Sequence, residues 1–345
     1  MNYREVIEAA RPKLGKYCKG CYVCNGRACG NTIPGPGAKG SGDTAVRNYE
    51  KWQQLRVNMD CLVKGGAIDT SLELFGRTYR YPFFAGPVGA VQMHYGTDYT
   101  DMTYNDVLVS ACAENGIMAF TGDGVNPDQT IAAAEAIKKA GGIGIPVIKP
   151  WSKEVINQKM ELVKAAGASA VGMDVDASGL PFLKNQNPPA GAKSVEEMKE
   201  IIADAGLPFI IKGVMTVAGA KKAMEAGAAA IVVSNHGGRV LDGCPATAEV
   251  LGKIADMVHA QSKMKVLVDG GIRSGLDVFR ALALGADGVI ICRPFVTAIY
   301  GAGAEGITAY VEKIGGELRD TMEMCGARSL KDINKGMLWK EGNIF

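Results

Sequence analysis

The sequence has little net charge, few histidines and no long hydrophobic run. Its 345 residues include 38 Lys and Arg against 36 Asp and Glu, which gives a formal charge of +2. This balance excludes an overall field that would draw the protein to nucleic acid or to an acidic membrane surface. The longest apolar runs, such as Ala228 to Val233, are far shorter than a bilayer span, and the first residues lack the apolar core of a secretion signal. We therefore expect a soluble, cytoplasmic protein with no nucleic-acid or membrane partner.

The nine cysteines do not suggest a disulfide framework, because the chain is long and several of them lie inside apolar runs. We expect reduced thiols in a reducing compartment. Four of the nine, Cys18, Cys21, Cys24 and Cys29, follow the pattern C-x2-C-x2-C-x4-C. Four thiolates in one short loop suit a zinc ion or an iron–sulfur cluster. However, structural zinc sites usually combine two separated knuckles, and Pro34 comes later than the proline of a ferredoxin motif. Zinc, an iron–sulfur cluster and metal-free loop thiols therefore all remain open.

From about residue 83, short runs rich in Val and Ile alternate with stretches of helical periodicity, which is typical of repeated strand–helix units around a parallel sheet. Eight strands are predicted: Phe83 to Gly86, Ile117 to Thr121, Ile145 to Lys149, Ala170 to Val175, Phe209 to Lys212, Ala230 to Ser234, Lys265 to Val268 and Gly288 to Ile291. Predicted helices include Lys153 to Ala166, Ser194 to Ala205, Thr216 to Ala226, Ala246 to Ala260 and Gly275 to Leu284. Eight near-continuous apolar strands favour a closed (β/α)8 barrel over an open sheet.

The pattern divides the chain into a barrel at residues 69–345 and an N-terminal extension at residues 1–68, packed together as a single domain. Residues 69–81 form two alternating runs around a glycine, and we expect a hairpin that closes the barrel floor. Residues 1–60 are expected to hold one polar helix and a loop rich in Gly, Pro and Cys.

In a (β/α)8 barrel, the catalytic and ligand-binding residues lie just past the carboxyl ends of the strands. Strand five ends at Lys212, strand six at Ser234 with His236 and Arg239 beyond it, and strand seven at Asp269 before Gly270, Gly271 and Arg273. The two glycines allow backbone N–H groups to approach an anion closely, and the helix from Gly275 adds its positive end. Together with Arg273 and Arg293 after strand eight, this turn is a candidate phosphate cradle; a simple tight turn is the alternative.

His236 is one of three histidines. With an ordinary pKa of ~6.5, a neutral imidazole at the barrel mouth is suited to accept a proton. A histidine that only supports a loop is the alternative. The flanking glycines favour the catalytic role, and Arg239 is placed to hold a carboxylate by a bidentate pair.

These residues resemble the FMN-dependent 2-hydroxy-acid oxidising family, which includes glycolate oxidase and lactate oxidase. The resemblance is dense over residues 209–295, in Ile-Ile-Lys-Gly-Val, Ser-Asn-His-Gly-Gly-Arg, Asp-Gly-Gly-Ile-Arg and Ala-Leu-Ala-Leu-Gly-Ala. It is weaker over residues 69–176, and none is seen in the first 60 residues. The resemblance implies that Lys212 lies beside flavin N1 and O2, that His236 takes the hydroxyl proton, and that Arg239 binds the substrate carboxylate.

The resemblance also implies a wider site. Asp176 stabilises the imidazolium of His236, and Asp174 contacts the flavin ring; loop solvation is the alternative for both. The remaining predicted FMN contacts are Gly86, Pro87, Val88, Thr121, Ser234, Asp269, Gly270, Gly271, Arg273, Cys292 and Arg293.

Three departures from the family pattern affect the predicted substrate site. Val147 and Lys149 stand where the family has Gln and Tyr, and the second arginine after strand four is missing. Lys149 and Lys184 are then the predicted substrate-binding cations beside Arg239. Cys292 replaces a glycine before Arg293, but its N–H remains.

The leading prediction is therefore a flavoenzyme that oxidises a small 2-hydroxy acid or a related hydroxy compound, with a homotetramer implied by the resemblance. An iron–sulfur cluster beside the flavin would indicate a dehydrogenase with a protein acceptor. Two alternatives remain: an isomerase similar to type 2 isopentenyl-diphosphate isomerase, and a barrel that binds flavin without catalysis. Arg239 favours a carboxylate substrate and so disfavours the isomerase.

Overall fold

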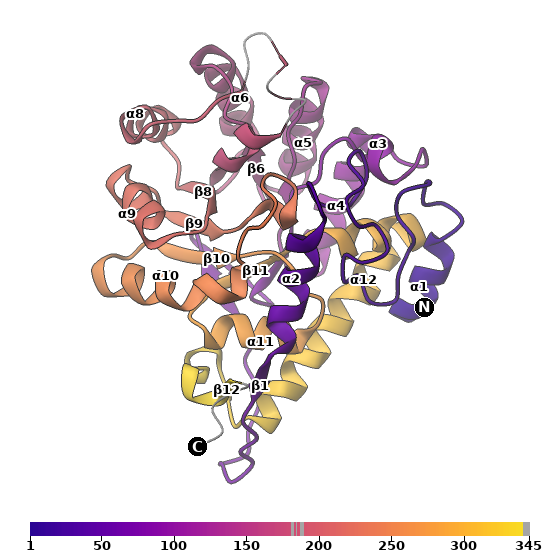
Figure 1. Cartoon of the computed structure of the whole chain (residues 1–345), viewed down its shortest axis with the longest axis vertical. Helices are drawn as coiled ribbons and strands as arrows, with labels where there is room; N and C mark the ends of the chain where they lie inside the picture. Colours follow the sequence, from indigo (N-terminus) through magenta and orange to yellow (C-terminus); the bar gives the residue numbers. More distant parts are fainter. Residues whose placement is uncertain (181–182, 184, 187–189, 341–345) are drawn as a thin grey trace.

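A computed structural model describes residues 1–180, 183, 185–186 and 190–340. Its centre is a sheet of eight parallel strands surrounded by helices (Figure 1). The strands are β4 (Phe83–Ala85), β5 (Phe120–Thr121), β6 (Ile145–Ile148), β7 (Val171–Asp174), β8 (Phe209–Val214), β9 (Ala230–Val233), β10 (Lys265–Val268) and β11 (Gly288–Ile291). They pair in the order β4-β11-β10-β9-β8-β7-β6-β5, and a parallel bridge between Ala85 and Ala119 joins the two ends. The predicted barrel is confirmed.

The helices follow the strands as the periodicity predicts. They are α3 (Val91–Tyr95), α4 (Asp101–Glu114), α5 (Asp128–Lys139), α6 (Lys153–Ala165), α8 (Val195–Ala205), α9 (Val217–Glu225), α10 (Thr247–Gln261), α11 (Gly275–Ala283) and α12 (Arg293–Met324). The five helices predicted by residue range begin and end within one residue of those ranges. Because strands such as β4, β6, β7, β9 and β11 are buried along their whole length, they have apolar residues on both faces.

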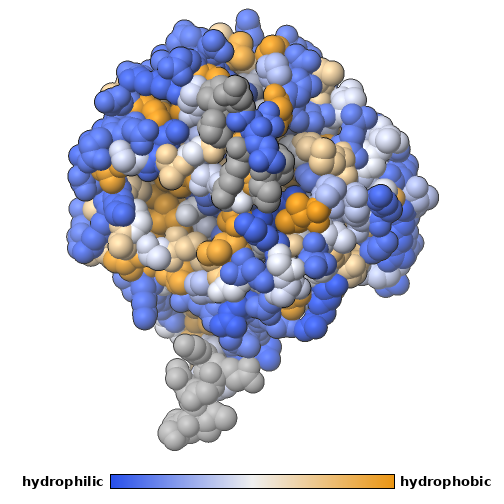
Figure 2. All heavy atoms as spheres, turned by 45° about the horizontal axis from the view of Figure 1, so that its top comes forward, coloured by the Kyte–Doolittle hydropathy of each residue, from blue (hydrophilic) through white to orange (hydrophobic). Residues whose placement is uncertain are grey.

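The predicted hairpin consists of β2 (Leu72–Leu74) and β3 (Arg77–Tyr79), which pair antiparallel. Leu72 packs next to Gly288, the first residue of β11, so the hairpin lies at the amino ends of the strands. This leaves the opposite end of the barrel, where the strands finish, for a site. None of the helices in the described residues is long and apolar enough to cross a membrane. On the face shown in Figure 2, hydrophobic residues lie in patches among hydrophilic ones.

The N-terminal segment contains more regular secondary structure than the sequence predicts. It contains two helices instead of one, α1 (Tyr3–Ala10) and α2 (Asp43–Gln53), and β1 (Leu55–Val57) pairs with the C-terminal β12 (Leu338–Lys340). In Figure 1, α1 lies against α12, and α2 runs beside α10 and α11. The polar residues of α2 that face the barrel belong to a buried hydrogen-bond network, which the prediction of one polar helix does not include.

Asn48 on α2 is the centre of this network and is 1% exposed. Its side-chain amide exchanges two hydrogen bonds with the amide of Asn235, and its Oδ1 also accepts from the backbone N–H of Thr247. Near it, Trp52 Nε1 donates to the carbonyl of Gly270 at 2.8 Å. Thus α2 fixes the loops after β9 and β10, which carry His236 and Arg273.

We expect Asn48→Ala to lower the free energy of unfolding by about 1–3 kcal/mol, because it leaves buried polar groups of Asn235 and Thr247 without partners. Urea unfolding followed by circular dichroism measures the change. The matched control is Asn58→Ala at an exposed position, which should change stability by less than about 0.5 kcal/mol. Equal small effects of both variants would show that the α2 network does not hold the loops.

Candidate active site

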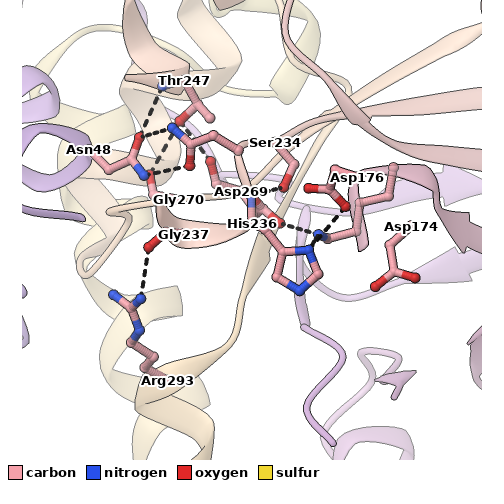
Figure 3. Close-up of polar contacts among 12 residues, drawn as sticks. Asn48, Asp174, Asp176, Ser234, His236, Gly237, Thr247, Asp269, Gly270 and Arg293 are labelled. Carbon is pink, nitrogen blue, oxygen red and sulfur yellow. Dashed lines mark hydrogen bonds and ion pairs between the residues drawn. The ribbon is translucent and has the colours of Figure 1, made fainter. Parts of the chain in front are cut away.

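His236 and Asp176 meet at the carboxyl ends of the strands (Figure 3). Lys212, on β8, reaches the same place. Nδ1 of His236 lies 3.0 Å from Oδ1 of Asp176 and 3.5 Å from Nζ of Lys212. The backbone holds His236 in place: its φ is 56°, and its N–H donates to Ser234 Oγ at 3.0 Å. Nε2 of His236 has no partner within the described ranges, so it is the ring nitrogen available to a substrate.

The charges around His236 keep its ring neutral and its partner ionised. Burial and the charge of Lys212 lower the pKa of His236, and Asp176 only partly opposes them. Burial works against ionisation of Asp176, but Lys212 and His236 outweigh it and hold the pKa of this carboxyl at about 2. Burial also opposes the charge of Lys212, yet the carboxylates of Asp176, Asp269 and Asp174 raise its pKa above the usual value. The result is a neutral base beside an anion and a cation.

Lys149 pairs with Asp174 instead of standing free for a substrate. Its Nζ bonds to Oδ2 of Asp174, and both side chains are buried. Asp174, Asp176 and His236 also place ligand atoms within 4.8 Å of one another. Because Lys149 and Lys212 already neutralise the two carboxylates, this group needs no metal ion to compensate its charge.

Arg239 does not extend freely into the mouth, because its Nη1 donates to the carbonyls of Gly35 and Gly37 at 2.6 and 2.8 Å. The same N-terminal loop is fixed by a bond from the Lys39 N–H to the Gly238 carbonyl. Nε and Nη2 of Arg239 have no protein partner among the residues that the structure describes. Arg239, the predicted carboxylate-binding residue, is therefore held through Nη1, while the N–H groups of Nε and Nη2 remain available as donors.

His94 supports this loop from the other side, as Nδ1 accepts from the N–H of Gly35 at 2.8 Å. Burial and the charge of Arg239 lower its pKa from 6.5 to about 4. Between these values an unfolded chain binds a proton that the folded protein does not bind. The stability contributed by neutral His94 is thus complete above pH 6.5 and is lost as the pH falls towards 4.

We expect the titration of His94 to lower the free energy of unfolding by on the order of 3 kcal/mol as the pH falls from 6.5 to 4. His94→Asn, whose Oδ1 replaces Nδ1 as acceptor without titrating, should lose most of this dependence. Urea unfolding at several pH values compares the two proteins. If the free energy of unfolding falls equally with pH in both proteins, His94 does not titrate in the predicted way.

The predicted phosphate cradle has the expected glycine turn, but the helix N-terminus that is free to bind an anion is not the one predicted. Gly270 and Gly271 both have positive φ, 90° and 82°, and their N–H groups have no protein partner in the described chain. A Cβ on Gly271 would lie 2.3 Å from the backbone oxygen of Asn48, so this glycine is also required for the close approach of α2. The N–H groups that begin α11 bond to Glu317 and Ser274. The free helix N-terminus is that of α12, which begins at Arg293 with no side-chain cap.

The two arginines of the cradle occupy different places. Arg293 Nη2 donates to the carbonyl of Gly237, the residue after His236, at 2.9 Å (Figure 3). Arg273 Nε donates to the carbonyl of Cys24 at 2.6 Å, and so contacts the cysteine loop. Cys292 precedes α12, and a Cβ on Gly86 would lie 2.2 Å from its Sγ, so the turn after β4 packs directly on it. Pro87 and Val88 continue that turn.

Several buried polar atoms at the mouth lack a partner within the described chain and so fit a bound flavin. They are Thr121 Oγ1, Asp174 Oδ1, Asp176 Oδ2 and Asp269 Oδ1. Unpartnered buried acceptors are costly, and a flavin offers ring N–H and ribityl hydroxyl donors. With Lys212 as a buried cation and the glycine turn as a phosphate site, these residues fit FMN.

One polar cluster of the mouth is missing from the sequence-based prediction. Asp123, after β5, is buried and accepts from Lys159 Nζ, Thr130 Oγ1 and Trp151 Nε1 at 2.6 to 2.9 Å. Its Oδ2 also accepts from the N–H of Lys149. Two features of the sequence could have indicated this cluster: Asp123 follows the second barrel strand, and Lys159 lies on the apolar face of α6. Lys184, the other predicted substrate contact, lies outside the described residues.

The comparisons with known proteins agree with this geometry. The sequence profile of the family described as FMN-dependent dehydrogenase matches residues 36–187 and 182–340. An FMN-dependent alpha-hydroxy acid dehydrogenase of Schizosaccharomyces pombe is 30% identical, with 88% of this chain and 86% of the relative covered. An L-lactate dehydrogenase of Haemophilus influenzae is 29% identical, with coverages of 84% and 88%. A crystal structure of a mandelate oxidase variant superposes with a TM-score of 0.81 at 26% identity, over 99% of this chain and 98% of the other.

The profile match corrects one expectation. It begins at residue 36, so the resemblance includes α2 and is not absent from the first 60 residues. These three relatives are oxidases and dehydrogenases, and the isomerase alternative is not favoured. Because the profile covers most of the barrel and α2, the chain belongs to the FMN-dependent dehydrogenase family.

Proposed function

We propose that this enzyme oxidises a small 2-hydroxy carboxylate at the mouth of the barrel, with FMN as the electron acceptor and His236 as the proton acceptor. The observation that carries the proposal is the contact of His236 Nδ1 with Asp176 at 3.0 Å, which leaves Nε2 without a protein partner in the described ranges. FMN, when bound, supplies the chemistry of accepting two electrons from the carbinol carbon.

The residues of the chain prepare the proton transfer. A neutral His236 takes the hydroxyl proton at Nε2, and the resulting imidazolium is stabilised by the ionised Asp176 at Nδ1. Because the pKa of Asp176 is held at about 2, this carboxylate stays charged over the working pH range. Lys212, buried between Asp176, Asp269 and the ring of His236, provides the fixed positive charge that favours an electron-rich flavin.

The carboxylate of the substrate is held by Arg239 in this proposal. Nη1 is used by the carbonyls of Gly35 and Gly37, which orient the guanidinium and leave its remaining N–H groups as donors. Lys149 acts through Asp174, whose charge it neutralises, and is a positioning residue instead of a substrate anchor. Lys184 stays a predicted contact.

Anaerobic mixing with lactate, glycolate, mandelate and longer hydroxy acids tests the proposal. We expect at least one of them to bleach the visible absorbance of the bound flavin. Absence of bleaching with every member of the panel, in protein that contains FMN, contradicts the proposal.

We expect Arg239→Met to raise KM for the reactive hydroxy acid by about 10- to 100-fold, because a charged hydrogen bond contributes about 1.5–3 kcal/mol. Steady-state kinetics measure the change, and the value for Arg47→Met, an exposed residue of α2 paired with Glu249, should stay near wild type. An unchanged KM in Arg239→Met would remove this residue from the substrate site.

The relatives differ in their substrates, and they include lactate dehydrogenases, a (S)-2-hydroxy-acid oxidase and a 4-hydroxymandelate oxidase. The cytoplasmic location and a homo-oligomeric state, tetrameric by resemblance, stay predictions. The reducing compartment expected from the cysteine pattern likewise stays a prediction. Size-exclusion chromatography with light scattering tests the oligomeric state.

A further inference from the structure

The cysteine loop between α1 and α2 gathers four thiols that the proposed oxidation does not use. Cys18, Cys21, Cys24 and Cys29 are all free and partly buried. The loop turns sharply between them, because Gly20 and Gly26 have positive φ of 53° and 86° and the N–H of Gly30 bonds to the Gly26 carbonyl. The result is a compact fold that brings four cysteines of one short segment to the same place.

The four thiols are near enough to repel one another if they ionise. Cys18 lies close enough to Cys21, Cys24 and Cys29 for charges on these groups to act on one another. The same holds for Cys21 with Cys24 and Cys29, and for Cys24 with Cys29. Thus all six pairs interact, and four thiolates are stable here only with a compensating cationic centre.

Two arginine side chains from the barrel lie next to the cysteines of the loop. Arg273 Nε donates to the Cys24 carbonyl at 2.6 Å. The guanidinium groups of Arg293 and Arg273 both lie near enough to Cys29 to act on a charge there. Two arginines beside four cysteines suit an anionic centre, such as a metal cluster held by thiolates.

The spacing of the sulfur atoms distinguishes between the metal centres. A structural zinc ion holds four sulfurs at ~2.3 Å in a tetrahedron, which brings them close together. In the described residues, three or more His, Cys, Asp or Glu ligand atoms come within 4.8 Å only at Asp174, Asp176 and His236, and therefore not in the cysteine loop. A cubane cluster carries its thiolates on four separate irons, which sets them further apart than a single ion does.

We propose that Cys18, Cys21, Cys24 and Cys29 bind a [4Fe–4S] cluster. Its place is defined by Arg273, which contacts Cys24 and follows the glycine turn after β10 at which we place the phosphate of FMN. The cluster would adjoin the flavin site, where it would take one electron from reduced FMN and pass it to a one-electron acceptor protein, so that its oxidised and reduced forms differ by that electron alone. The nearby arginines favour the more negative, reduced form and so raise its reduction potential.

The test is the metal and sulfide content of the full-length protein, purified without oxygen and, in a second sample, reconstituted with ferrous iron and sulfide. We expect ~4 iron and ~4 acid-labile sulfide per chain. After reduction with dithionite, we expect a paramagnetic signal in electron paramagnetic resonance. FMN is counted separately in the same samples, so that failure of the cluster and failure of the flavin site are distinguishable.

Cys21→Ser and Cys24→Ser should lose at least tenfold in iron and sulfide while they keep FMN. Cys61→Ser and Cys244→Ser, which change cysteines outside the loop, are the matched controls and should keep the cluster. Two results would overturn the proposal: absence of iron and sulfide from both wild-type samples, or one zinc ion per chain without sulfide. Iron and sulfide that persist when all four loop cysteines are changed would overturn it as well.

Discussion

His236→Asn is expected to lower kcat by about 10²- to 10⁴-fold, the usual contribution of a general base. Asparagine tolerates the positive φ of 56° at this position, and its amide donates to Asp176 much as a ring N–H does. The variant therefore keeps the loop and removes only the base at Nε2. Stopped-flow measurement of flavin reduction under anaerobic conditions gives the rate constant directly.

The control for this experiment is His259→Asn. His259 is exposed on α10, where its Nε2 lies 3.0 Å from Asp287, far from the carboxyl ends of the strands. We expect its rate constant to match wild type. If His236→Asn reduces its flavin as fast as this control, the proton goes to another group and the proposed role of His236 is wrong.

Lys212→Met is expected to slow flavin reduction by about 10²- to 10³-fold while flavin binding weakens much less, because a fixed charge acts mainly on the electron-rich state. The lysine is 4% exposed and is the cation nearest to Asp269, at 3.7 Å, so its loss also leaves a buried carboxylate unpaired. We expect a further loss of about 3–5 kcal/mol in unfolding free energy. Flavin affinity from fluorescence quenching and the single-turnover rate constant separate the two effects.

Lys265→Met is the control for this experiment. Lys265 is a half-exposed lysine of β10 and pairs with Asp287 at 2.9 Å. It should leave flavin reduction unchanged and alter stability by less than about 1 kcal/mol. Equal loss of flavin binding and flavin reduction in Lys212→Met would argue that this lysine is only a structural charge.

The sequence predicted most of the barrel because its signals are local. Each strand is a short apolar run between turns, and each carboxyl end carries its polar residues within a few positions, as in the run from Ser234 to Arg239. The contact of His236 with Asp176 was predicted only through the family resemblance. Sixty residues separate them, and spacing alone does not join them.

The residues that the prediction missed depend on tertiary contacts. Asn48 has no local signal of burial, since only its pairing with Asn235 shows that a polar helix faces the core. Lys159 is similar: a lysine on a helix is usually solvated, and its buried bond to Asp123 appears only when α6 packs on the barrel. Arg239 likewise contacts Gly35 and Gly37, some 200 residues away in the sequence.

The pH dependence of the flavin reduction rate constant, measured in single turnovers with one hydroxy acid, tests the central claim most directly. Only neutral His236 accepts the proton, and burial together with Lys212 lowers its pKa below the usual 6.5. We predict a rate constant that is constant above neutrality and falls only below pH 6.5, with no such fall in His236→Asn. A rate constant that already falls above pH 7, or the same acid limb in wild type and variant, would contradict the account.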